Sequence, residues 1–385
     1  MANTASTPMP GITRRKLMQA AACAALGFHW PTSSAAADEV SWLADVQQPP
    51  AKLPPETPRL SSLLTGSQGQ SITTLADWQV ERRRLRQQWL DFLGPMPAER
   101  PPLQLEVLRE ESCPGGTRQL VRYHSEIDLP VEGYLLRPGA EIRGRDRRST
   151  LRAGLVALHQ TSHSTIEEIA GVQGPPAQHL GLKLMQRGFV VFCPRCFLWQ
   201  SVTSFQEAVE TFSRRHPGTL GMHKMLWDAQ RGVDVLASLS REVDPQRIGA
   251  VGHSLGAKEA LYLAAFDDRI AAAVASEGGI GFPATNWDAP WYLGPGIKAP
   301  DFPRNHHELL ALIAPRPFLI LGGETGPGAA DGDRSWPYLE AALPVYRLYR
   351  TPARLGLYNH HEGHTISDAT LVRLTQWLET YLGVG

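Results

Sequence analysis

The sequence predicts an α/β fold with a mostly parallel central sheet and helices on both of its faces, and three observations predict it. Short apolar runs alternate with stretches of helical periodicity, beginning near residue 154. The runs are apolar throughout, as strands are when both faces of a sheet are covered. Hydrophobic residues make up 42% of the 385 residues, which suffices for the core of one large unit.

Each element is predicted by its own pattern. A helix at 75–93 is predicted because its apolar residues recur on one side: Leu75, Trp78, Trp89, Leu90 and Leu93. Residues 103–110 and 117–137 have the composition of strands. Later strands are expected at 154–159, 188–193, 247–252, 269–276, 317–323 and 354–360. Helices between them are expected near 176–187, 219–240, 255–266, 335–349 and 367–382.

The charge balance argues against one class of partner. Lys and Arg total 38, and Asp and Glu also total 38, so the formal net charge is zero. A nucleic-acid-binding chain normally has a basic excess. We therefore expect no nucleic-acid partner.

Residues 1–37 have the pattern of an export signal. Arg14 and Arg15 precede a short apolar stretch, and small residues suited to cleavage follow near Ala37. The pattern resembles the twin-arginine signal, and the apolar stretch is too short to span a bilayer. We expect a periplasmic or secreted protein that has no contact with a membrane after cleavage.

Three cysteines lie beyond this segment: Cys113, Cys193 and Cys196. A zinc site would need a second pair of ligands at similar spacing, and the sequence has none. We expect the pair at 193 and 196 to form either a loop disulfide or two small buried thiols.

The motif Gly252-His253-Ser254-Leu255-Gly256 stands between an apolar run and a helical stretch. A nucleophile on a sharp turn from strand to helix needs neighbours without a β-carbon, because strand and helix approach closely there. This context predicts Ser254 as a nucleophile. The N–H of Leu255, at the start of the helix, would face a developing oxyanion. A second oxyanion N–H is expected from Gln160, which follows the strand at 154–159.

A serine hydroxyl needs a base, which in such folds is a histidine after the last strand. Residues 357–368 offer His360, His361 and His364, of which we favour His364 because it follows Gly363 and precedes the final helix. The acid that orients the base is open among three carboxylates. We rank Asp331 first, Glu277 second and Asp333 third.

These motifs resemble the α/β-hydrolase superfamily over roughly residues 100–383. The resemblance is to its dienelactone-hydrolase-like and acetyl-xylan-esterase-like branch. The stretches "GHSLGAKEALYLAAFDDRIAAAVASEGG" and "HHELLALIAPRPFLIL" also resemble glucuronoyl esterases, although Leu255 stands where those enzymes usually have Arg. The resemblance implies that Lys258 contacts a sugar hydroxyl, that Glu277 can be the orienting acid and that Trp287 lines a carbohydrate site.

The sequence thus predicts an export signal at 1–37, a lead-in with one helix at 38–100, and an α/β-hydrolase catalytic domain at 101–385. The expected function is that of a secreted serine hydrolase. It would cleave carboxylic esters, carbohydrate-linked ones in particular, through an acyl-enzyme on Ser254, with no cofactor and no metal. The substrate would be a small-molecule or polysaccharide ester. The alternatives are a prolyl-oligopeptidase-like serine peptidase and a non-catalytic binding protein with the same fold.

Overall fold

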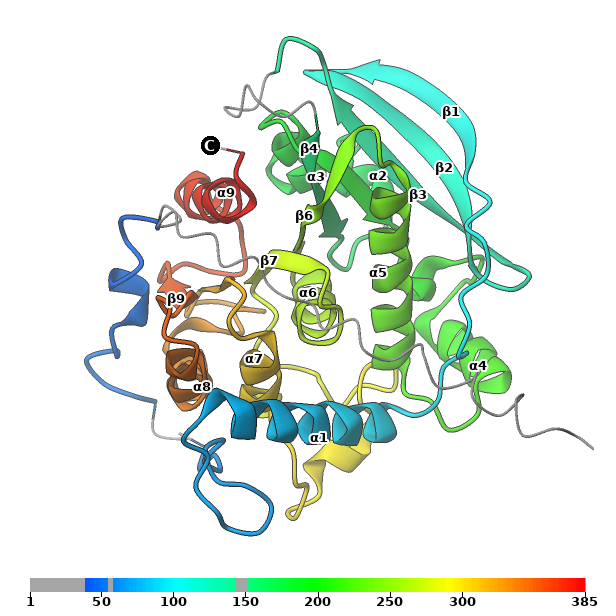
Figure 1. The fold of residues 1–385 in the computed structure, drawn as a ribbon. Coiled ribbons are helices and arrows are strands. Elements are labelled where there is room, and N and C mark those ends of the chain that lie inside the picture. Colours follow the sequence, from blue (N-terminus) through cyan, green and yellow to red (C-terminus); the bar gives the residue numbers. More distant parts are fainter. Residues whose placement is uncertain (1–38, 55–57, 143–150, 385) are drawn as a thin grey trace, which may run out of the picture. The chain divides into compact units, whose positions relative to one another are not determined.

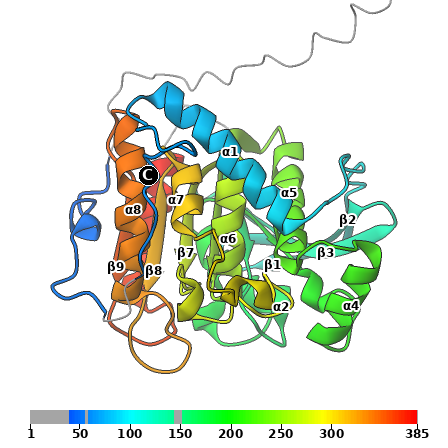
Figure 2. The same ribbon diagram turned by 90° about the horizontal axis from the view of Figure 1, so that it is seen from below.

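The computed structural model describes residues 39–54, 58–142 and 151–384 (Figures 1 and 2). The predicted export signal at 1–37 lies outside the described residues. Within the described ranges, no helix is long and apolar enough to cross a membrane.

The described residues form a nine-stranded sheet in the order β1-β2-β3-β5-β4-β6-β7-β8-β9. The first three strands and β5 pair in antiparallel fashion, and the pairs from β5 through β4 to β9 are parallel. The fold class predicted from the sequence is confirmed. The strands are β1 (Glu106–Cys113), β2 (Gly116–Glu126), β3 (Leu129–Pro138), β4 (Arg152–Leu158), β5 (Val190–Pro194), β6 (Val243–His253), β7 (Ile270–Ser276), β8 (Phe318–Gly322) and β9 (Leu355–Asn359).

Helices cover both faces of the sheet. On one face, α5, α6, α7 and α8 pack into one apolar core, to which α1 also contributes; on the other, α2, α3 and α9 pack into a second core. The helices are α1 (Leu75–Leu93), α2 (Thr165–Ile169), α3 (Leu180–Met185), α4 (Phe205–Arg215), α5 (Gly221–Ser238), α6 (Leu255–Phe266), α7 (His307–Ile313), α8 (Trp336–Leu348) and α9 (Asp368–Leu382). The sequence did not predict α2, α4 or α7.

Helix α1 has the bounds that the sequence predicts. It begins after Thr74, whose hydroxyl oxygen accepts a hydrogen bond from the N–H of Asp77 (3.2 Å), and it ends before Gly94. Its buried side includes Trp78 and Trp89, and Figure 2 shows the helix lying across the outer side of the α5–α7 layer. Leu75, expected on the buried side, is 39% exposed because it stands in the first turn.

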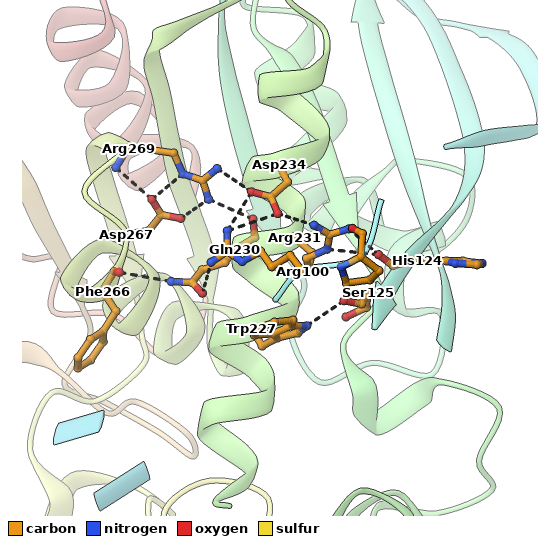
Figure 3. Close-up of polar contacts among 11 residues, drawn as sticks. Arg100, His124, Ser125, Trp227, Gln230, Arg231, Asp234, Phe266, Asp267 and Arg269 are labelled. Carbon is orange, nitrogen blue, oxygen red and sulfur yellow. Dashed lines mark hydrogen bonds and ion pairs between the residues drawn. The ribbon is translucent and has the colours of Figure 1, made fainter. Parts of the chain in front are cut away.

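A polar network fixes α5 to its neighbours (Figure 3). The carboxylate of Asp234 accepts hydrogen bonds from three guanidinium groups, those of Arg100, Arg231 and Arg269. Arg231 also donates to the carbonyl of His124 on β2 (2.8 Å). Because Arg269 directly precedes β7, the network fixes α5 relative to both β2 and the beginning of β7.

The free edge of β9 is covered by the lead-in. The short helix η1 (Asp45–Gln47) lies beside this strand (Figure 1). The Nε2 of Gln47 donates to the carbonyls of Ala353 and Leu355, and Val46 packs against Gly356. The bond to Leu355 satisfies a carbonyl at the start of the edge strand, and the bond to Ala353 satisfies one just before it.

Both cysteines of the "CPRC" stretch are buried free thiols. Of the two predicted alternatives, the structure therefore has the pair of buried thiols. Burial raises the pKa of both thiols, which leaves them protonated and unreactive.

Candidate active site

Ser254 lies on a strained turn between β6 and α6. Its φ of 58° and ψ of −116° place it in a region that non-glycine residues rarely adopt. A β-carbon on Gly252 would lie 2.1 Å from the carbonyl oxygen of Gly256, and one on Gly256 would lie 2.1 Å from that of Leu158. Both glycines are therefore required by close backbone contacts, as the sequence motif predicts.

The start of α6 and the end of β4 meet beside Ser254. Leu255 is the first residue of α6, so its N–H belongs to the free N–H groups at the positive end of the helix. The contact of Gly256 with Leu158 and His159 brings the loop that follows β4, and hence Gln160, against this helix end. The two backbone segments predicted to hold an oxyanion are thus adjacent.

The loop after β4 is held by buried hydrogen bonds. The Nδ1–H of His159 donates to the carbonyl of Gln160 (2.8 Å), and its Nε2 accepts from the N–H of Cys196 (3.1 Å). Burial lowers the pKa of His159 to about 4, so the ring is neutral at pH 7. The side chain of Gln160 donates to the carboxylate of Glu168 on α2. Because both ring nitrogens of His159 bond to backbone groups, its role is structural.

The loop after β9 brings His364 against His253, the residue before Ser254. The centroids of the His364 and His253 rings are 4.6 Å apart, and His253 directly precedes Ser254. His364 also packs against Gly328, where an added β-carbon would lie 3.1 Å from the imidazole. Its side chain is 27% exposed. The structure therefore brings two residues 110 positions apart, Ser254 and His364, to the same edge of the sheet.

Glu277 stands between two histidines of this loop. Its Oε1 lies 2.9 Å from Nε2 of His360, and its Oε2 lies 3.9 Å from Nδ1 of His364. Its Oε2 also accepts a hydrogen bond from the N–H of Ala330 (3.2 Å). Glu277 directly follows β7 with a positive φ of 59°, and its side chain is fully buried. That turn directs the carboxylate toward the histidine loop.

The surroundings of Glu277 keep it ionised. Burial alone would raise the pKa of its carboxyl group, but His360, His364 and the Ala330 N–H together lower it to about 2. Burial, assisted by the nearby His364, lowers the pKa of His253 to about 3. At pH 7 the site thus combines a buried carboxylate with a neutral imidazole at position 253, whose Nδ1 lies 3.2 Å from Oγ of Ser276.

Asp331, ranked first as the orienting acid, does not face an imidazole. Its carboxylate accepts hydrogen bonds from the N–H groups of Gly279 and Ile280 (both 2.9 Å) and from the Ser335 hydroxyl (2.5 Å). Burial raises the pKa of Asp331, whereas that of Glu277 is lowered. The ranking from the sequence is therefore corrected: Glu277, ranked second, is the carboxylate that faces His364.

Lys258 and Trp287 are buried rather than open to a substrate. Lys258 is 4% exposed, and its Nζ donates to the carbonyl of Gly278 (2.6 Å) and lies 4.3 Å from the centre of the Trp287 ring. Trp287 is 1% exposed and donates from Nε1 to the carbonyl of Gly279 (2.6 Å). Their placement does not fit the direct sugar contacts that the resemblance implies.

Asp331, Lys258 and Trp287 share a structural role instead. All three bind the backbone of residues 278–280, which directly follow Glu277, and the Nδ1–H of His306 adds a bond to the carbonyl of Ile280 (2.7 Å). The segment that carries the buried carboxylate is thus held by four side chains. This arrangement fixes the position of Glu277.

The remaining candidates lie farther along the same edge. Asp333, ranked third, accepts a hydrogen bond from Nδ2 of Asn359 (2.9 Å). The side chain of His361 is 70% exposed and contacts Glu324 at 2.9 Å. Neither residue contacts Glu277, Ser254 or His364 within the part of the chain that the structure describes.

The sequence predicts no role for His253, and it offers His360 only as an alternative to His364. His253 is the first variable residue of the G-x-S-x-G motif, and His360 faces Glu277. A histidine inside the motif and a second histidine four residues before His364 were visible in the sequence. Only the fold shows that His360 lies against Glu277 and that the His253 ring lies against that of His364.

Comparisons with known proteins agree with this fold. Residues 165–300 match the model of the dienelactone hydrolase family, and a search of curated protein sequences found no match. A glucuronoyl esterase from Solibacter usitatus has a TM-score of 0.68 at 17% identity, over 85% of this chain and 99% of its own. At this identity the likeness shows the fold alone.

Two further solved structures are similar. A CE15 glucuronoyl esterase from Teredinibacter turnerae T7901 has a TM-score of 0.61 at 22% identity, over 83% of this chain and 88% of its own. An acetyl xylan esterase from Paenibacillus sp. R4 has a TM-score of 0.52 at 16% identity, over 89% of this chain and all of its own. The chain is therefore an α/β-hydrolase-fold protein, and the segment that carries its nucleophile turn matches the dienelactone hydrolase family.

Proposed function

We propose that this protein is a serine-dependent carboxylic ester hydrolase with Ser254 as nucleophile, His364 as base and Glu277 as orienting acid. One observation carries the proposal: the ring of His364 contacts that of His253, which directly precedes Ser254 on its strained turn, and a buried carboxylate faces the same His364 ring. The family match and the esterase neighbours support the same reaction class.

Exposure supports His364 over His360 as the base. A general base must reach the substrate, and the side chain of His364 is 27% exposed whereas that of His360 is 2% exposed. His360 is a positioning residue that lies against the Oε1 atom of Glu277. The other oxygen of that carboxylate then faces His364, and a shift of about 1 Å would bring the pair within hydrogen-bond distance.

The reaction follows from these positions. A proton on Nδ1 of His364, facing Glu277, leaves Nε2 free to take the Ser254 proton as the hydroxyl attacks the ester carbonyl. The N–H groups of Leu255 and Gln160 stabilise the oxyanion. The alcohol leaves with the proton from His364, and water then hydrolyses the acyl-enzyme with the same base. The residues named here provide the nucleophile, base and oxyanion donors for every step.

The substrate is proposed to be an ester of a carbohydrate. The similar solved structures include glucuronoyl and acetyl xylan esterases, which supports this class. The pattern of residues 1–37 supports export, so we propose that the protein acts in the periplasm or outside the cell. Fractionation of cells that express the full chain, with a variant in which Arg14 and Arg15 are both Lys, tests the export route.

A fluorophosphonate probe tests the nucleophile. We expect the probe to label the wild-type protein at Ser254, and we expect Ser254→Ala to abolish both labelling and turnover of p-nitrophenyl acetate. Ser62→Ala, at an exposed serine, is the matched control and should retain both. Labelling without turnover of any ester, but with amide cleavage, would indicate a peptidase, and absence of labelling would indicate a binding protein.

A further inference from the structure

A cavity of about 260 Å³ lies beside the histidine loop but contains none of the proposed catalytic residues. Its walls come from the lead-in, the start of α8, the end of β9 and the helix α9. The residues that matter here are Trp42, Asp45, Asp333, Tyr358, His361 and Arg373. The proposed reaction leaves this cavity without a role.

Arg373 is held in the cavity wall by rings alone. Its guanidinium carbon lies 4.8 Å from the centre of the Trp42 ring and 5.5 Å from that of Tyr358. Across the described ranges, Arg373 makes no hydrogen bond or ion pair, although it is partly buried. A guanidinium group has five N–H donors, so this one is fixed in place with its donors available.

The opposite polarity is also present in the cavity. Asp45 has no side-chain hydrogen bond to any described residue, and Asp333 uses only Oδ1, to accept from Asn359. The cavity wall thus contains two carboxylates and one guanidinium group. Their combined charge disfavours a carboxylate ligand, whereas hydroxyl groups can donate to the carboxylates and accept from the guanidinium.

The size of the cavity limits what can bind. Pockets for drug-sized ligands begin near 300 Å³, so a cavity of about 260 Å³ has room for one small ring. Tyr358, which is partly exposed, offers apolar surface to the C–H groups of such a ring, whereas Trp42 is 6% exposed and supports Arg373 from behind. The match is to a pyranose, which combines a ring of this size with several hydroxyls.

We propose that this cavity is a second sugar-binding site, which holds one neutral pyranose unit of the carbohydrate whose ester is cleaved at Ser254. The inference rests on the proposed function for the identity of that carbohydrate. His361 lines the cavity, while His360 and His364 of the same loop lie at the catalytic carboxylate. A sugar bound in the cavity would thus lie next to the loop that carries the base.

A binding experiment tests the site without using catalysis. The Ser254→Ala protein is titrated with methyl β-D-xylopyranoside and with xylobiose, followed by ligand-observed NMR. We expect binding that weakens at least tenfold when Arg373→Gln or Asp333→Asn is added. Arg84→Gln is the matched control, because Arg84 lines a different cavity. Trp42 keeps its contacts with Trp377 and Gln376 in the Arg373 variant, so the fold should persist.

Activity assays give a second readout. In otherwise wild-type protein, Arg373→Gln should raise KM for acetylated xylan several-fold and leave turnover of p-nitrophenyl acetate unchanged. Equal sugar binding with and without Arg373, no binding of either neutral sugar, or preferential binding of glucuronate would overturn the proposal. If the wild type cleaves no ester, the proposed function fails, and the NMR titration still decides whether the cavity binds a sugar.

Discussion

The imidazole rings of His253 and His364 lie 4.6 Å apart, so the residue that precedes Ser254 contacts a residue of the loop that follows β9. Burial keeps His253 neutral at pH 7, with a pKa of about 3. An uncharged ring in this position supports the His364 ring without competing for the negative charge of Glu277. The contact thus joins the turn that carries Ser254 to the loop that carries His364.

The two histidines at Glu277 should differ sharply in their effect on catalysis. We expect His364→Ala to lower kcat for p-nitrophenyl acetate by about 10²–10⁴, because it removes the general base. His360→Gln should lower kcat much less and mainly change its pH profile, since His360 acts through Glu277. Steady-state kinetics from pH 5 to 9 measures both, with His361→Ala as control. A larger loss in the His360 variant would reverse the assignment.

The two candidate acids can be separated in the same way. Glu277→Gln should reduce kcat by orders of magnitude while the protein stays folded, because an amide cannot stabilise the imidazolium. Asp331→Asn should instead lower the unfolding free energy by about 1–3 kcal/mol, because it breaks buried hydrogen bonds. Urea denaturation and kinetics on both variants measure the difference. Catalytic loss confined to the Asp331 variant would restore the ranking from the sequence.

An ion cluster buried between α5 and the end of β2 should contribute strongly to the free energy of unfolding. Nζ of Lys224 lies 2.7 Å from the carboxylates of both Glu126 and Asp228, and the side chains of Lys224 and Glu126 are each 3% exposed. Lys224→Met leaves the buried Asp228 without its cation and removes one of the cations at Glu126, so we expect a loss of about 3–5 kcal/mol in urea denaturation. Lys298→Met breaks a surface pair with Asp288 and should cost less than about 1 kcal/mol. Similar costs for the two variants would contradict this account.

Glu126 should make stability depend on acid pH. Burial would raise the pKa of Glu126, but Lys224, Arg215 and His216 lower it to about 2, below the ordinary value of 4.5. A lowered pKa contributes stability above pH 4.5, and that contribution is lost as the pH falls from 4.5 toward 2. The difference in unfolding free energy between wild type and Glu126→Gln should therefore shrink over this range, by up to about 3 kcal/mol. A difference that stays constant with pH would refute the prediction.

Glu259 should show the opposite dependence. It is 4% exposed on α6, and burial raises the pKa of its carboxyl group to about 8. A raised carboxyl pKa stabilises the fold below pH 4.5, and the benefit is lost as the pH rises from 4.5 to 8. We expect Glu259→Gln to become more stable than wild type by a few kcal/mol over this window. Chemical denaturation of both proteins at pH 5 and pH 8 checks the sign. A difference in unfolding free energy between variant and wild type that is the same at both pH values would contradict the prediction.

The sequence predicts the elements that have a strong period. Helix α1 has the predicted bounds. Each apolar run forms a strand, because a short run that is apolar throughout is typical of a strand covered on both faces. Helix α4 was missed although its signals were present: Ser204 caps the helix by accepting from the N–H of Glu207, and Phe205 and Phe212 recur at helical spacing. Helix α7 has seven residues, too few for a clear period.

The roles within the site depended on burial and loop direction, which the sequence pattern does not contain. The placement of Ser254 and His364 at one edge of the sheet follows from the fold class, because each residue lies after the carboxyl end of a parallel strand. The sequence ranks Glu277 below Asp331, because the direction of the Glu277 side chain depends on a positive φ that the sequence does not reveal. Lys258 and Trp287 have the residue types of a sugar site, and only their 4% and 1% exposure shows that they support a backbone segment instead.

The bonds from Gln47 to the outer strand have a consequence for the behaviour of the chain at high concentration. A protein trimmed to begin at α1 would present β9 as a bare template on which another molecule could add a strand. We therefore expect the loss of the lead-in to promote self-association through β9, while the edge of the sheet that carries Ser254 and His364 stays intact.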